Sequence, residues 1–408
     1  MNAYWRKTFF IIWSGQAISL LSSAVVQFSI IWWITNKTES AIVLSSATLV
    51  GLLPQVLCTP FAGVFADRWN RKSVMIMADL LVAVSSLVLA MLFLYGEPHT
   101  MQIYIILALR AIGFSFHFPA FQASIPMIVP VEQLARTAGF NQALQSVVKI
   151  AGPLLGAIVL NVWSISGAMM LDVIGAIIAN MMLLFVSIPQ PASIQKTVHK
   201  NAIFGEMYLG FKALSEARGL FILTVVSAVS IFIYIPVSSM IPLIVIKHFH
   251  GDAWHIGVVR MFYGSGMLLG SIILGIWGGP KKKIYLINSA IISMGIDFII
   301  MGSLPSNRFA WLIIAAAFLG LAIPMFNGPF YAILQTQIES SMQGRILSFV
   351  NGIMHIATPL GLILAGPVAD KLGVNILFVF SGFFISTIGT GCFFIPSIIH
   401  IEGNIISN

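Results

Sequence analysis

Twelve long apolar stretches, separated by short polar connections, run through this sequence. About 20 apolar residues cross the hydrocarbon core of a bilayer as a helix. The chain is 58% hydrophobic and 8% charged, whereas soluble domains are about 45–50% apolar and about 25% charged. A water-soluble globule is therefore excluded, because it would expose large apolar patches. We predict an all-α integral membrane protein with twelve transmembrane helices, at 8–34, 42–66, 73–95, 101–125, 137–160, 166–188, 219–246, 256–279, 284–303, 309–333, 346–369 and 374–396.

The longest polar break divides the twelve helices into two groups of six. It predicts an N-terminal six-helix bundle at 1–188, a cytoplasmic linker at 189–218 and a C-terminal six-helix bundle at 219–408. Within the linker, aromatic and aliphatic residues recur at helical spacing over 204–217, which predicts an amphipathic helix on the inner membrane surface.

The two halves also share residues at nearly constant separation. The matched pairs are Glu132 with Glu339, Arg136 with Arg345, and Pro153 with Pro359. Such matches indicate duplication of a six-helix unit, with a substrate site between the halves near mid-membrane.

The basic residues are unevenly placed. Of 21 Lys and Arg residues, 14 fall in the inner connections if the N-terminus is inside, four fall outside and three lie within spans. This bias predicts that both termini are cytoplasmic. Because topology accounts for the basic excess over 13 Asp and Glu residues, no nucleic-acid partner is expected.

A charged connection follows the second span in the run GVFADRWNRK. A glycine allows close helix approach, and a carboxylate among cations forms charge-assisted bonds that break and re-form as helices rock. The cations alone are typical of any inner loop. The ordered combination is more specific, and its members are Gly63, Asp67, Arg68, Arg71 and Lys72.

This pattern resembles the signature loop of the major facilitator superfamily, Gly-x-x-x-Asp-Arg-x-x-Arg-Lys, and the match is complete. The resemblance implies the major facilitator fold and a gating role for Asp67 and Arg71. The counterpart in the second half, GGPKKK at 278–283, keeps the glycines and cations but lacks the acid.

Arg110 interrupts the fourth span, where an arginine at the bilayer centre costs about 2.5–3.5 kcal/mol. Its surroundings, LRAIGFSFHFPAF, resemble the fourth-helix motif of the superfamily, which is linked with proton transfer. Gly113 stands three residues after Arg110, whereas the family pattern places it four after. The alternative is that Arg110 snorkels to the outer interface.

Four other charges within the spans are candidates for proton coupling. The acids are Asp79, Asp172 and Asp297, with Asp172 slightly favoured over Asp79, because burial raises the pKa of a carboxyl toward the range of a proton carrier. Lys149 lies deep in the fifth span. On a functional interpretation, Lys149 carries a proton, neutralises a carboxylate or repels cationic substrates. On a structural interpretation, it forms an ion pair with a neighbouring acid.

The fifth span also contains GPLLG, with Gly152, Pro153 and Gly156. This run is similar to the core of the motif associated with antiporters in the superfamily, where small residues allow tight packing and proline permits a bend. The similarity favours exchange-driven efflux over uptake.

A bulky hydrophobic substrate needs a roomy apolar cavity with few polar anchors. The candidates for its lining are Gln16, Gln27, Phe114, Phe118 and Phe326. The alternative for the phenylalanines is that they face lipid or neighbouring helices.

His248, His250, Asp252 and His255 crowd one outer connection. Their types fit a zinc site, but their spacing matches no motif, so a solvated loop is preferred. The sequence contains no phosphate-binding Gly-Lys-Ser/Thr loop and no Gly-x-Ser-x-Gly nucleophile elbow. We expect neither an enzyme nor a cofactor or metal.

Segments across the whole chain resemble the bacterial macrolide efflux proteins of the Mef type. They are 15–21, 67–72, 109–120, 131–138, 172–176 and 359–374. The resemblance implies a proton-driven antiporter of the bacterial cell membrane that exports hydrophobic drugs, chiefly 14- and 15-membered macrolides, by alternating access. The implied partners are the drug, protons and the lipid bilayer, with an ATP-binding cassette protein acting alongside. Export of a tetracycline, a phenicol or an endogenous metabolite is the alternative, and an ungated channel or a membrane enzyme is less compatible with a gated, duplicated bundle.

Overall fold

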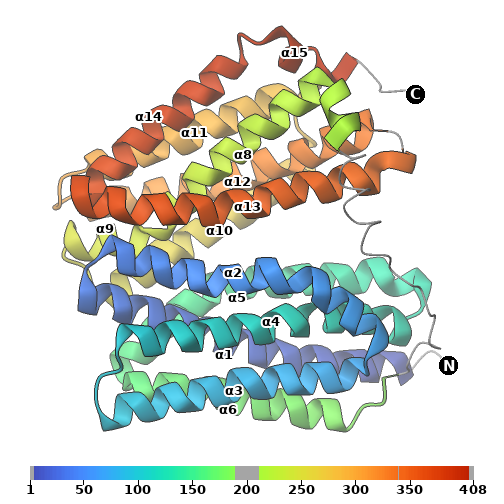
Figure 1. Ribbon diagram of the computed structural model, residues 1–408, viewed down its shortest axis with the longest axis vertical. Helices are drawn as coiled ribbons and strands as arrows, with labels where there is room; N and C mark the ends of the chain where they lie inside the picture. The colour runs from blue at the N-terminus through green and yellow to red at the C-terminus, as the bar shows by residue number, and fades with distance from the viewer. Residues whose placement is uncertain (1–3, 189–210, 339, 404–408) are drawn as a thin grey trace. The chain divides into compact units, whose positions relative to one another are not determined.

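A computed structural model of the protein describes residues 4–188, 211–338 and 340–403 (Figure 1). Within these ranges, the structure describes only the backbone of residues 59–68, 135, 340–341 and 403. The described residues form helices and no strands. Twelve segments are long and apolar enough to cross a membrane, which confirms the predicted all-α protein with twelve transmembrane helices.

The chain divides into two compact units. The first takes in the described residues of 1–195 together with 251–261, and the second takes in those of 196–250 and 262–408. The helices up to residue 188 are α1 (Tyr4–Thr38), α2 (Ala41–Arg68), α3 (Arg71–Tyr95), α4 (Thr100–Ile128), η1 (Val131–Gln133), α5 (Leu134–Val162) and α6 (Ile165–Leu184).

The helices after residue 210 differ from expectation at one span. The stretch predicted at 219–246 is two helices that meet at Met240, because Pro242 has no N–H to donate to the carbonyl of Ser238. From Arg218 onward the helices are α8 (Arg218–Ser239), α9 (Ile241–Lys247), α10 (Ala253–Trp277), α11 (Lys283–Ser303), α12 (Phe309–Gln337), α13 (Ser340–Leu372), α14 (Val374–Cys392), α15 (Pro396–Ile399) and η2 (Ile401–Gly403).

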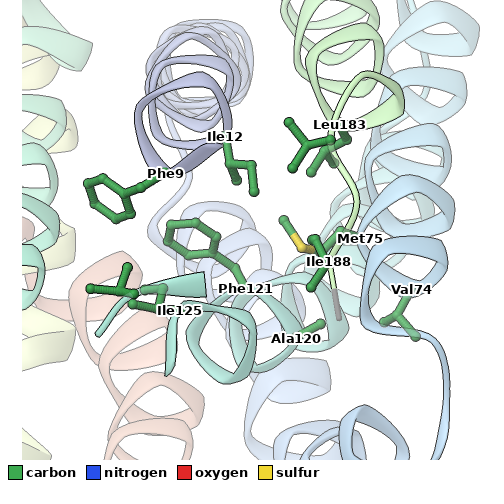
Figure 2. Packing of buried hydrophobic residues seen from close by; sticks show 11 residues of the cluster. Phe9, Ile12, Val74, Met75, Ala120, Phe121, Ile125, Leu183 and Ile188 are labelled. Atoms are coloured by element: carbon green, nitrogen blue, oxygen red, sulfur yellow. The ribbon is translucent and has the colours of Figure 1, made fainter. Parts of the chain in front are cut away.

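Two apolar clusters form the core of the first unit. The Phe121 cluster joins α1, α3, α4 and α6, and Figure 2 shows side chains from these helices converging. Its members are Phe9, Ile12, Val74, Met75, Ala120, Phe121, Ile125, Val129, Leu183, Val186 and Ile188. The Leu107 cluster consists of Val26, Ile30, Ile34, Ala47, Leu89, Ala90, Ile103, Ile106, Leu107, Ala168 and Met169. Because α1 and α3 begin at the Phe121 cluster whereas α4 and α6 end there, the helices alternate in direction.

Part of the predicted linker lies outside the described residues, namely 189–210, as does Glu339 of the matched pairs. Residues 211–216 are helical, at the end of the predicted amphipathic helix over 204–217. Leu214 is fully buried, whereas Phe211 is exposed and packs beside Phe221 and Phe349.

Candidate functional site

Arg110 of α4 and Asp172 of α6 form a buried ion pair. The exposed fractions of the two side chains are 7% and 1%. Nη1 of Arg110 donates to Oδ2 of Asp172 and to the hydroxyl oxygen of Ser86. Two residues that the sequence offered as separate candidates are therefore in direct contact. The alternative that Arg110 snorkels to the interface is wrong, because its guanidinium points into the bundle.

Serines from two further helices complete the surroundings of this carboxylate. Ser23 Oγ of α1 donates to Oδ1 of Asp172 at 2.6 Å, and Ser86 Oγ of α3 approaches Oδ2 at 2.7 Å. Both oxygens of Asp172 thus accept hydrogen bonds in addition to the cation. A buried charge is tolerated when it is paired and hydrogen-bonded. The ion pair therefore links four helices.

Asp79 of α3 and His117 of α4 form a second buried pair with fewer partners. Nε2 of His117 lies 3.5 Å from Oδ1 of Asp79, and the two side chains are 9% and 8% exposed. Oδ2 of Asp79 and Nε2 of His117 lack a hydrogen-bond partner among the described residues. Gln16 and Ser19 of α1 approach the Asp79 carboxyl, and Nε2 of Gln16 is also buried without a partner in the described part of the chain.

Sequence reasoning weighed His117 as a proton relay but preferred a neutral histidine bonded to a neighbouring helix, and so did not select it for proton coupling. The available signal was its spacing, because residues seven apart, such as Arg110 and His117, lie on one face of a helix about 10 Å apart along the axis. Asp79 and Ser86 have the same spacing on α3, as do Gln16 and Ser23 on α1.

These polar residues form one band across the first unit, enclosed between the two apolar clusters. The polar band consists of Gln16, Ser19, Ser23, Asp79, Ser86, Arg110, His117 and Asp172. On α3 it falls between Met75 and Leu89, and on α4 between Leu107 and Ala120. The α1 and α6 members likewise fall between residues of the Phe121 and Leu107 clusters. Apolar packing at both ends limits the access of water to the band.

The signature-loop residues begin at the end of α2. Gly63, Asp67 and Arg68 lie on its last turns, and their side chains are outside the described ones. Arg71 is 7% exposed, and its Nη1 donates to the carbonyl oxygen of Ala123 at 2.6 Å.

Lys72 binds the end of α6. Its Nζ donates to the carbonyl oxygens of Leu184 and Val186, at 3.1 and 2.8 Å. Carbonyls at a helix C-terminus carry partial negative charge and lack intrahelical donors. Together Arg71 and Lys72 therefore tie the start of α3 to the ends of α4 and α6, around the Phe121 cluster.

Replacement of Lys72 by methionine is expected to lower the thermal stability of the purified protein. Hydrogen bonds to charged groups contribute about 1.5–3 kcal/mol each, and part-exposure of the lysine places the loss at the lower end of that range. The melting temperature in detergent measures it. Lys7→Met, at an exposed lysine of α1, is the control, and equal melting temperatures for the two variants would contradict the capping role.

The remaining coupling candidates lie elsewhere. Asp297 is buried on α11 of the second unit, and its Oδ2 has no hydrogen-bond partner within the described ranges. Lys149 is exposed on α5, and no described carboxylate lies within ion-pair distance of it. The ion-pair interpretation of Lys149 therefore finds no partner in the part of the chain that is described.

The glycines of the fifth span face α1. A Cβ on Gly152 would lie 2.6 Å from Cβ of Ala24, and one on Gly156 would lie 2.6 Å from Cδ1 of Phe28. Pro153 lies between them inside α5. These small residues let α5 approach the helix that contributes Ser23 to the polar band.

The five proposed cavity residues divide by exposure. Gln16 is 1% exposed and belongs to the polar band, and Phe326 is buried and stacks on Phe330 with ring centroids 5.7 Å apart. Gln27 is exposed. Phe114 and Phe118 are each 37% exposed and stack on one another at 5.9 Å. Gln27, Phe114 and Phe118 are thus the accessible members.

The histidine-rich connection forms two separate contacts. Nε2 of His248 lies 2.7 Å from the carbonyl oxygen of Leu304, and Nδ1 of His255 lies 2.7 Å from Oδ1 of Asp252. Burial raises the pKa of Asp252, but hydrogen bonds from His255 outweigh it, and the pKa falls below its ordinary value. Across the described ranges, no three His, Cys, Asp or Glu side chains are grouped to hold a metal.

Residues 12–362 match the sequence model of the Major Facilitator Superfamily. The chain is 39% identical to macrolide efflux protein A of Streptococcus pyogenes, over 95% of this chain and 96% of that protein. It is 38% identical to macrolide efflux protein A of Enterococcus faecalis, over 79% of this chain and 99% of that protein. A crystal structure of a POT family transporter in complex with 5-aminolevulinic acid shares the fold, with a TM-score of 0.73, 11% identity and coverage of 95% and 96%.

Proposed function

This chain belongs to the major facilitator superfamily, and from that premise we propose that it is a proton-driven antiporter that exports macrolide antibiotics by alternating access. Membership makes it a multi-pass membrane transporter. The observation that carries the proposed drug class is the 39% identity to a macrolide efflux protein, which extends over nearly the whole of both chains. The GPLLG run on α5 supports exchange rather than uptake.

Proton coupling is supported by the titratable side chains of the polar band. Ionisable residues inside membrane helices are expensive and commonly mark proton relays. One charge that crosses 100 mV supplies about 2.3 kcal/mol, and a tenfold gradient costs about 1.4 kcal/mol. One proton per drug therefore supports a drug gradient of about 40-fold.

We propose that the protein lies in the bacterial cell membrane with both of its termini in the cytoplasm. Arg6, Lys7, Arg71 and Lys72 lie at the end of the first unit where the Phe121 cluster packs. At the opposite end of the unit, Lys37 is paired with Glu97. An excess of cations at one end of a helix bundle marks the cytoplasmic side.

Expression in a drug-sensitive bacterial host is expected to raise the inhibitory concentration of erythromycin several-fold, and to leave those of tetracycline and chloramphenicol unchanged. A susceptibility panel measures all three against cells that carry the empty vector. Resistance to tetracycline or chloramphenicol instead would favour the alternative drug classes. A parallel arm with a co-expressed ATP-binding cassette protein tests whether resistance depends on that partner.

Energy coupling is tested with the purified protein. In liposomes, an inward proton gradient is expected to drive erythromycin out, and collapse of that gradient with an ionophore is expected to stop net transport. Drug gradients that persist after the collapse would contradict proton coupling and leave drug transport itself intact.

A further inference from the structure

We infer that the Asp79–His117 pair, rather than the Arg110–Asp172 ion pair, binds the proton that is exchanged for drug. This inference rests on the proposed antiport function and assigns its proton site. It reverses the slight sequence-based preference for Asp172, and it adds a histidine to the site.

The two pairs differ in how completely their carboxylate oxygens are hydrogen-bonded. Both oxygens of Asp172 accept hydrogen bonds from serines of neighbouring helices, and the carboxylate is neutralised by Arg110. Arginine does not lose its proton in proteins, so protonation of Asp172 would leave a buried cation without a counter-charge. The Arg110–Asp172 pair is therefore held in its charged state and serves as a fixed link between helices.

Asp79 and His117 are not paired with an arginine or a lysine among the described residues. Their nearest atoms are 3.5 Å apart, and Oδ2 of Asp79 has no hydrogen-bond partner among the residues described. Both groups can exist charged or neutral. With one proton, the pair is either a neutral carboxyl beside a neutral imidazole or a carboxylate beside an imidazolium. Both arrangements have zero net charge, which burial favours.

The neighbouring charges do not compensate for loss of that proton. Arg110 and Asp172 pair with one another, and the guanidinium of Arg71, two turns before Asp79 on α3, is directed to the carbonyl oxygen of Ala123. The groups that approach from α1 are Gln16 and Ser19, which are neutral. Release of the proton therefore leaves one net negative charge in the polar band. The side-chain amide of Gln16, which approaches the Asp79 carboxyl from α1, is a donor that can stabilise this charge.

The position of the pair also suggests how its proton is gated. His117 stacks on Phe121 with ring centroids 6.5 Å apart, and Met75 lies one turn from Asp79. The Phe121 cluster thus covers the pair, and Arg71 and Lys72 bind the helix ends around that cluster. A rearrangement of the signature loop that loosens this packing would admit water, and the proton would pass from the pair to that water.

The test uses the full-length protein in liposomes that contain a trapped pH dye. In the wild type, addition of erythromycin is expected to change the signal of the dye, because drug exchange moves protons across the liposome membrane. In Asp79→Asn, the drug-induced proton signal is expected to fall to that of protein-free liposomes, while downhill exchange of labelled erythromycin continues. Ser85→Ala is the matched control on α3, because its buried hydroxyl bonds only to Leu81 of its own helix among the described residues. It is expected to retain both activities.

The outcomes separate this inference from the proposed function. A proton signal that survives in Asp79→Asn would overturn the assignment of the site and leave antiport intact. Drug transport by the wild type without any proton signal would overturn the antiport proposal itself.

A measurement on the wild type covers the case in which Asp79→Asn does not fold. A hydrophobic carbodiimide reacts with protonated carboxyls in apolar surroundings, and mass spectrometry locates the adduct. Modification at Asp79 that declines in alkaline buffer is the expected result. Modification at Asp172, or at neither residue, would contradict the assignment.

Discussion

Replacement of Arg110 by glutamine is expected to abolish most of the yield of folded protein in the membrane. The change leaves Asp172 buried at 1% exposure without its cation. Removal of one partner of a buried ion pair costs about 3–5 kcal/mol, which is a large share of the roughly 5–15 kcal/mol that stabilises a typical domain. Asp172→Asn is expected to be equally damaging, because it isolates the arginine instead.

The double variant, Arg110→Gln with Asp172→Asn, is expected to recover much of the folded yield. It removes both charges and leaves amides that can still bond to Ser23 and Ser86. Fluorescence-detected size-exclusion chromatography of the tagged proteins measures the folded fraction after heating. Ser115→Ala, a buried position on α4 whose hydroxyl bonds to Ile112 of its own helix, is the control. A double variant no better than the single ones would contradict a structural ion pair.

Replacement of Gly266 by alanine is expected to have the second largest effect on folding. On α10, a Cβ at Gly266 would lie 2.0 Å from the carbonyl oxygen of Ala317 on α12. The contact is reciprocal, because a Cβ at Gly320 of α12 would lie 2.0 Å from the carbonyl oxygen of Tyr263 on α10. In each case the obstacle is backbone, so the two helices must separate. Overpacking of this kind costs about 1–3 kcal/mol or more.

Gly275 provides a matched control for this prediction. It lies on the same helix, and a Cβ there would meet nothing within 4 Å. Gly275→Ala is therefore expected to melt at or above the wild-type temperature, because alanine has the higher helix propensity. Melting of both variants in detergent, followed by size-exclusion chromatography, gives the comparison. Equal stability of Gly266→Ala and Gly275→Ala would show that close approach of α10 and α12 is not required.

The fold was largely accessible from the sequence, but the arrangement of the candidate site was not. The long apolar stretches identified all twelve helices. The one notable departure is the break at Met240, which the nearby Pro242 could have indicated because proline has no N–H to donate within a helix. The sequence also singled out Arg110, Asp79 and Asp172 as unusual, because charges within a bilayer are costly. It did not pair Arg110 with Asp172, and it placed Gln16 in a substrate cavity rather than beside Asp79.

The sequence by itself determined which segments are apolar enough to enter the membrane and which side chains are too polar to face lipid there. Both follow from the cost of moving chemical groups out of water, which each residue carries independently of its neighbours. The tertiary structure alone decided which polar groups meet across helices, as Ser23 and Asp172 do over 149 residues of chain. Contact of this kind depends on the rotation and depth of each helix. These are set by packing at positions such as Gly152 against Ala24, and hydropathy does not encode them.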